Sequence, residues 1–89
     1  MKVENMTNKN GNRVPNQFVI YNDDGSVLFQ SYNSIIVKVD SKSGKVYLDS
    51  KFWDYSKTTG KYRNLFLHES KAETEKKIKS GEYELVNLN

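Results

Sequence analysis

The sequence contains no cysteine, a single proline and a single histidine. The absence of cysteine excludes disulfides, thiol catalysis and thiolate metal sites, and it fits a reducing compartment. No run of apolar residues exceeds four, whereas a bilayer-spanning helix needs about 20 mostly apolar residues. The first residues also lack the apolar stretch of a signal peptide. We therefore expect a cytoplasmic protein that makes no contact with membranes.

The groups that usually carry catalysis are equally scarce. His68 stands beside Glu69 and Ser70, but neighbours in sequence rarely converge on one reacting atom. Asp23-Asp24-Gly25 lacks the spaced carboxylates of a calcium loop. Thr58-Thr59-Gly60-Lys61 lacks the first glycine of a phosphate-binding loop, although a helix opening there, with Lys57 and Lys61, offers a site for one phosphate or carboxylate. The sequence thus predicts no enzyme and no cofactor or metal.

The length, aromatic content and net charge of the chain narrow the class of protein further. A chain of 89 residues forms one domain, and 12% aromatic residues are typical of a folded one. The net charge is +3, and residues 56–81 hold seven Lys or Arg against three Glu, a balance of +4. This charge is milder than that of a dedicated duplex-DNA binder.

The order of polar, β-branched and turn residues predicts the architecture. Residues 1–13 are mostly polar and predict a flexible N-terminal arm, closed by Pro15, so the domain is expected over residues 14–89. Asp24-Gly25 and Ser43-Gly44 are turn signals between apolar runs, as in a meander of short strands. The expected strands are Gln17–Tyr21, Val27–Gln30, Ser34–Asp40, Lys45–Asp49, a last short strand within Glu82–Leu88, and a further candidate at Phe52–Tyr55.

Two helices are candidates for the remaining residues. Ser70 and Glu73 form a capping box and Gly81 is a stop signal, which predicts a surface helix over residues 70–80. Residues 61–67 fit either a strand or a helix capped by Thr58 or Thr59, and we favour the helix, with Tyr62, Leu65 and Phe66 on one face. The fold class is α+β, a small antiparallel sheet of four to five strands with one or two short helices in a single domain.

The segment from Trp53 to Phe66 is unusual because it mixes aromatic, cationic and small residues. Trp53 is expected in the core, together with Phe18, Ile20, Leu28, Ile36, Val46, Leu65 and Phe66. Tyrosine and arginine beside lysine are typical of contact surfaces. The candidate contact patch is Tyr55, Lys57, Thr58, Thr59, Lys61, Tyr62 and Arg63.

The same segment carries a resemblance. Ser31-Tyr32-Asn33-Ser34-Ile35-Ile36 and the motif Trp53-Asp54-Tyr55-Ser56-Lys57-Thr58-Thr59-Gly60-Lys61-Tyr62 resemble a family of small uncharacterised phage and prophage proteins of Gram-positive bacteria. The resemblance runs from Val14 to Asn89. It implies a phage product acting inside the host bacterium and transfers no catalytic residue.

Three functions are compatible with these observations. The first is a non-enzymatic binding protein that engages a host or defence protein as an inhibitor or adaptor. The second is a single-stranded DNA- or RNA-binding module that uses Tyr55, Lys57, Lys61, Tyr62 and Arg63. The third is a virion structural or assembly protein. The sequence leaves the partner and the oligomeric state open.

Overall fold

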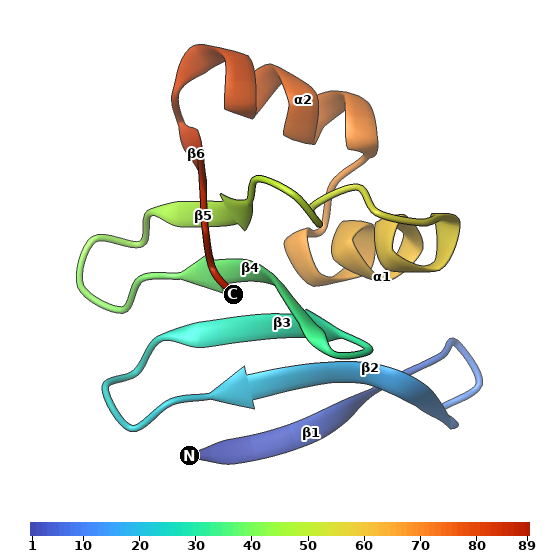
Figure 1. The fold of residues 1–89 in the computed structure, drawn as a ribbon. Coiled ribbons are helices and arrows are strands. Elements are labelled where there is room, and N and C mark those ends of the chain that lie inside the picture. Colours follow the sequence, from blue (N-terminus) through green and yellow to red (C-terminus); the bar gives the residue numbers. More distant parts are fainter.

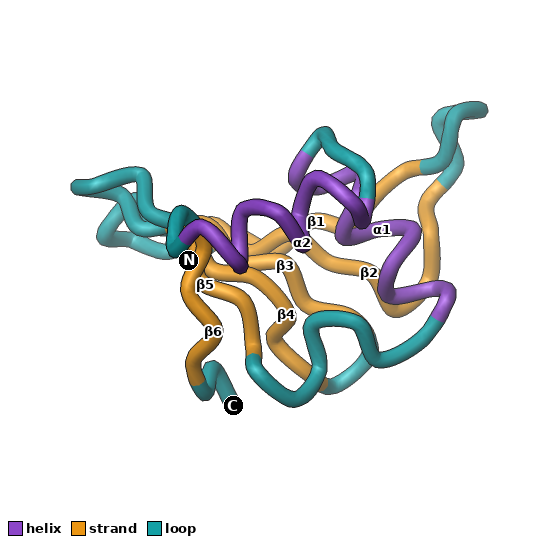
Figure 2. The backbone as a smooth tube through the Cα atoms, turned by 90° about the horizontal axis from the view of Figure 1, so that it is seen from above, coloured by secondary structure: helices purple, strands orange, loops and turns teal.

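The structure is a computed structural model that describes residues 1–89. One six-stranded sheet, with strands side by side in chain order, carries two helices on one face (Figures 1 and 2). The elements are β1 (Lys2–Thr7), β2 (Arg13–Tyr21), β3 (Val27–Ser31), β4 (Ser34–Val39), β5 (Val46–Asp49), α1 (Lys57–Leu67), α2 (Lys71–Ser80) and β6 (Tyr83–Val86).

The α+β prediction is confirmed, with corrections to the sheet. It has six strands instead of four to five, and β6 pairs with β5 in parallel, so the sheet is mixed. The parallel pair follows from the connection, because the two helices between β5 and β6 return the chain to the end of the sheet at which β5 begins.

The predicted arm over residues 1–13 is wrong for its first half. Lys2–Thr7 forms the edge strand β1, which pairs antiparallel with β2 from Lys2↔Tyr21 to Asn5↔Phe18. An edge strand has one neighbour and little to bury, so its polar composition resembles that of a loop.

The predicted strand at Phe52–Tyr55 does not form. The buried carboxylate of Asp49 accepts hydrogen bonds from the backbone N–H groups of Lys51 (3.1 Å) and Phe52 (2.8 Å). These bonds turn the chain away from the sheet at the end of β5, as Asp side chains do in turns. The chain then passes in a loop to the start of α1 (Figure 1).

Residues 61–67 are helical, which settles the open alternative in favour of α1. The N-cap is Ser56, not Thr58 or Thr59, and its side chain accepts a hydrogen bond from the Thr59 N–H. α1 ends at His68, which adopts a left-handed conformation (φ 57°). α2 confirms its signals, because the Ser70–Glu73 capping box is formed and Gly81 ends the helix at φ 84°.

The core lies between the helices and the sheet. Phe29 of β3 is fully buried and stacks on Phe66 of α1, with ring centroids 5.7 Å apart. Trp53 packs against this core but is only half-buried, and Leu65, expected on the inner face of α1, is 49% exposed. Burial of a phenylalanine stabilises a fold by about 1.5–3 kcal/mol, so contacts such as this one fix α1 on the sheet. The remaining buried apolar side chains are Ile20, Ile36, Val37, Leu48, Tyr62 and Tyr83.

Candidate functional site

The first turn of α1 positions the exposed part of the predicted contact patch. Lys57, Thr58 and Lys61 are exposed there, and no acidic residue stands in the first turn. The free N–H groups of a helix start favour negative charge, and the two lysines add to it. This end of α1 therefore presents positive potential to solvent.

Three residues of the predicted contact patch lie on the inner face of α1 and are not at the surface. Thr59, Tyr62 and Arg63 follow the i, i+3, i+4 spacing of one helix face, and all three are buried. The Thr59 hydroxyl lies 3.0 Å from the Ser31 hydroxyl, which ties α1 to β3. The patch as predicted was too broad, because these three residues hold α1 in place.

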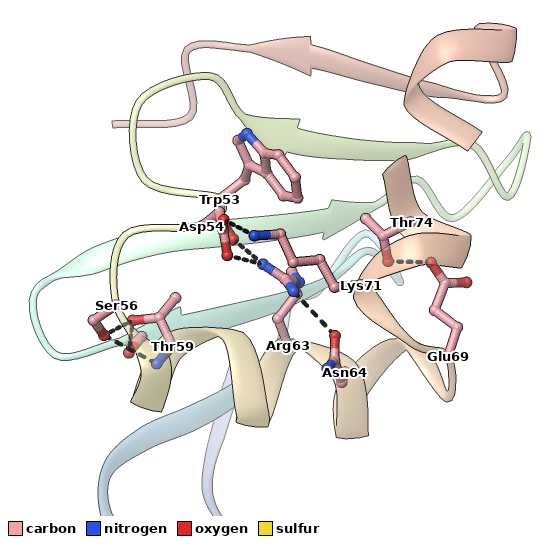
Figure 3. Close-up of polar contacts among 10 residues, drawn as sticks. Trp53, Asp54, Ser56, Thr59, Arg63, Asn64, Glu69, Lys71 and Thr74 are labelled. Atoms are coloured by element: carbon pink, nitrogen blue, oxygen red, sulfur yellow. Dashed lines mark hydrogen bonds and ion pairs between the residues drawn. The ribbon is translucent and has the colours of Figure 1, made fainter. Parts of the chain in front are cut away.

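Arg63 is the largest of these corrections, since it is only 1% exposed. Its side chain points toward Asp54 and Asn64 (Figure 3). Its Nη1 donates to the Trp53 carbonyl oxygen at 2.7 Å and to Asp54 Oδ1 at 3.1 Å, and its Nη2 donates to Asn64 Oδ1 at 3.0 Å. Its guanidinium also lies 5.1 Å from the Trp53 ring centroid, within cation–π range. Arg63 thus fixes the loop that leads into α1.

Asp54 links the second half of α1 to the start of α2. Its Oδ1 pairs with Arg63, and its Oδ2 lies 2.7 Å from Lys71 Nζ at the first residue of α2. Burial opposes ionisation of Asp54, but hydrogen bonds from Lys71 and Arg63 outweigh it and hold the pKa of this carboxyl below its usual value. Asp54 is therefore a charged junction between α1 and α2.

A basic hollow of about 450 Å³ opens beside this junction. No apolar side chain lines it, and four of its lining residues are cationic against one carboxylate, that of Asp54. Asp54 is shared by Arg63 and Lys71 and carries a single negative charge, so the charge offered to solvent comes mainly from Lys57 and Lys61, with a smaller share from Lys71. Such a hollow fits an anionic group, a carboxylate or a phosphate.

An aromatic hollow of about 520 Å³ lies on the other side of the first turn, and Ser56 lines both hollows. Tyr55, 70% exposed, and Tyr32, 49% exposed, line it together. Exposed tyrosines with a polar tip and a large ring suit contact with another molecule.

Both tyrosines are held by local structure. The Tyr55 ring meets the Phe52 ring edge to face, with centroids 5.5 Å apart. Tyr32 adopts a left-handed conformation (φ 55°), in which its N–H donates to the Asn16 carbonyl at 2.7 Å and its carbonyl accepts from Gln30 Nε2 at 2.7 Å. The Tyr55 ring and the Tyr32 backbone are thus held in place before binding, which lowers the conformational entropy lost on binding.

The structure therefore redraws the candidate surface. Tyr55, Lys57, Thr58 and Lys61 remain from the prediction, and Tyr32 and Lys71 join them. Sequence reasoning missed Tyr32, whose only signal is a tyrosine in the tight turn between two strands. We call Tyr32, Tyr55, Lys57, Thr58, Lys61 and Lys71 the binding surface.

Other kinds of site find no support in the side chains. No group of three His, Asp or Glu side chains gathers in an arrangement able to hold a metal ion. No helix is long and apolar enough to cross a bilayer. His68 is exposed at the end of α1.

The fold and this surface define a small single-domain α+β protein with a basic and an aromatic hollow at one helix start. The chain belongs to DUF8033, a family of unknown function whose model matches residues 1–82. The match includes β1 and both helices, which confirms that the chain falls in an uncharacterised family. No characterised protein and no solved structure shows significant similarity to the chain.

Proposed function

We propose that the protein is a non-enzymatic binding protein that engages a partner protein through the binding surface. The observation that carries this proposal is the pair of exposed, locally held tyrosines, Tyr32 and Tyr55, which line one hollow beside a second hollow rich in lysine. Tyrosine is among the residues that dominate binding energy at protein interfaces.

The chemistry of the two hollows indicates what kind of segment of the partner protein would fit them. The aromatic hollow suits an extended or looped segment with apolar and hydrogen-bonding groups. The adjoining basic hollow suits a carboxylate on the same segment, which would meet Lys57, Lys61 and Lys71. We therefore propose an acidic loop of the partner as the contact.

The resemblance to phage and prophage proteins supports a further detail of the proposal. By analogy with small phage products that act by binding, we propose a host or defence protein as the partner and inhibition or adaptation as the outcome. The site of action in this proposal is the bacterial cytoplasm.

Affinity capture from bacterial lysate tests the proposal with matched variants. The wild-type protein is expected to retain a protein that survives nuclease treatment, and Tyr55→Ala and Lys57→Glu are expected to lose it. Tyr21→Ala and Lys42→Glu change exposed residues of the same types outside the binding surface and should retain it. Capture that is equal for all variants, or absent, contradicts the proposal.

A second candidate function rests on the same two tyrosines. Aromatic rings beside lysines also suit single-stranded nucleic acid, with bases stacked on the rings and phosphates near the cations. Withdrawal of Arg63 into the interior leaves fewer cations for this role. Labelled oligonucleotides titrated over a salt series test it, because phosphate contacts produce an affinity that falls steeply with salt. No binding at low salt excludes it.

A further inference from the structure

The outer edge of β1 has no neighbour in the sheet (Figure 1). Edge strands that stay free usually carry devices against pairing, such as a proline, charged side chains, a bulge or a covering loop. β1 has no proline, its two charges, Lys2 and Glu4, are of opposite sign, and its one irregularity is a shift of register between Asn5 and Thr7. Residues before that shift therefore form a regular edge open to another strand.

The charges of this edge match a second copy of themselves. Lys2 and Glu4 lie on one face of β1, with Lys2 Nζ 3.0 Å from Glu4 Oε1; the Lys2 side chain is largely exposed and that of Glu4 is about half exposed. In an antiparallel pair of two β1 strands centred on Val3, Lys2 of each copy stands opposite Glu4 of the other. Opposite charges in directly facing positions stabilise a pair of strands, and like charges destabilise it.

The regular part of the edge selects this register over the next one. Lys2, Val3 and Glu4 all lie in β1 before the irregularity, so a two-fold axis at Val3 pairs these residues within the regular part of the strand. An axis at Glu4 would place Glu4 against itself and run the pairing into the shifted residues. An axis midway between Val3 and Glu4 would shift the pairing by one residue. It would set side chains from opposite faces of the sheet against each other, so this register is excluded.

The uncovered face of the sheet adds an apolar contribution at the same place. Both helices lie on one face (Figure 2), and Val3, paired with Ile20, points to the other. Val3 is 52% exposed, and Met1, Val3, Phe18 and Ile20 line an open hollow of about 400 Å³ at this edge. Pairing about Val3 brings the two hollows together and buries apolar surface of both copies.

From this edge we propose that the protein forms a symmetric dimer in which β1 pairs antiparallel with β1 of a second copy about a two-fold axis at Val3. The dimer has one continuous sheet, with the helices of both copies on the same side. It carries two binding surfaces, so a partner with two sites would be held by both. The proposal does not depend on the proposed binding function.

Charge exchange tests the partner and the register together. Lys2→Glu places a carboxylate opposite Glu4 of the other copy, and Glu4→Lys places an ammonium group opposite Lys2 of the other copy. Each variant alone should therefore dimerise at least about tenfold more weakly. A mixture of the two variants pairs opposite charges throughout and should restore the dimer as a heterodimer. Sedimentation of untagged protein measures all three samples.

Single-cysteine cross-linking checks the position of the axis. The natural chain has no cysteine, so Val3→Cys introduces one thiol that faces its copy at the distance of an antiparallel pair. Oxidation should link Val3→Cys chains rapidly, whereas Thr7→Cys, on the same strand beyond the irregularity, should link slowly. A wild-type chain that stays monomeric at millimolar concentration, or equal linking rates, overturns the proposal. So does a mixture of charge variants that remains monomeric.

Discussion

Arg63 donates a hydrogen bond of 2.7 Å to the carbonyl oxygen of Trp53 while its guanidinium lies 5.1 Å from the Trp53 ring. One side chain thus holds both the backbone and the ring of a residue ten positions earlier. Because this contact fixes the loop before α1, it also fixes the exposed Tyr55 and Lys57 in that loop and at the helix start. Arg63 was expected to be part of the contact surface, but it is buried and supports that surface from within.

Arg63→Ala should lower the free energy of unfolding by about 2–3 kcal/mol, because it leaves the Trp53 carbonyl without its donor and opens a cavity. Lys57→Ala changes an exposed side chain of the same helix and should alter stability by less than about 0.5 kcal/mol. Urea denaturation compares the two variants. Equal midpoints would show that Arg63 is not a structural residue.

Protonation of Glu69 should lower the free energy of unfolding in acid. Its side chain is 3% exposed and accepts hydrogen bonds from Lys77 Nζ (2.8 Å) and the Tyr83 hydroxyl (2.7 Å), and also from Thr74. Burial opposes ionisation, but the bonds from Lys77, Thr74 and Tyr83 outweigh it and lower the pKa of Glu69. A lowered pKa gives stability that is present above the unfolded-state pKa, about 4.3, and is lost as pH falls through the folded-state pKa.

Glu69→Gln isolates this effect. The variant should be less stable than the wild type at neutral pH, and the difference should shrink as pH falls below about 4. Thermal denaturation over a pH series gives both curves. A difference that stays constant with pH would contradict the assignment of a charged Glu69 to this network.

We expect a second loss of stability, at high pH, from ionisation of Tyr83. Burial, and then its hydrogen bond to Glu69, raise the pKa of Tyr83 to about 12. A raised pKa gives stability that is present below the unfolded-state pKa, about 10, and is lost as pH rises towards the folded-state value. The ultraviolet difference spectrum of wild type minus Tyr83→Phe should show tyrosinate forming only near the raised value. Ionisation of this group near its ordinary pKa would contradict the buried contact.

Ser56→Ala should destabilise the protein by about 1 kcal/mol, because it removes the acceptor for the Thr59 N–H at the start of α1. Ser56→Asp should restore most of the loss, since aspartate also caps helices. Urea denaturation measures both. If Ser56→Ala costs nothing, α1 does not begin where the structure places it.

The sequence predicts those elements whose signals are local. The glycines of the two predicted turns adopt positive φ, 90° at Gly25 and 72° at Gly44, and the capping box and Gly81 define α2. A turn or a cap is decided by a few neighbouring residues, so sequence patterns show it directly.

The predictions that failed concern residues whose structure depends on contacts with residues far away in the sequence. β1 has the composition of a loop because its stability comes from β2, and Arg63 is buried because its acceptors on Trp53 and Asp54 lie ten and nine residues earlier. A cation in an aromatic segment suggests an exposed contact residue, and only the folded loop shows that both Nη groups of Arg63 already donate hydrogen bonds within the protein. Tyr32 was missed for the converse reason, because the turn that exposes it is held by a hydrogen bond from its N–H to the carbonyl of Asn16 on another strand.

The central claim is that the tyrosines beside the start of α1 bind a partner protein. Its most direct test is the dissociation constant of the captured partner for Tyr32→Ala, Tyr55→Ala and the control Tyr21→Ala, each first shown to keep the wild-type unfolding midpoint. The account predicts that each of the first two weakens binding about tenfold or more, while Tyr21→Ala leaves it unchanged. Equal dissociation constants for all three variants would contradict it.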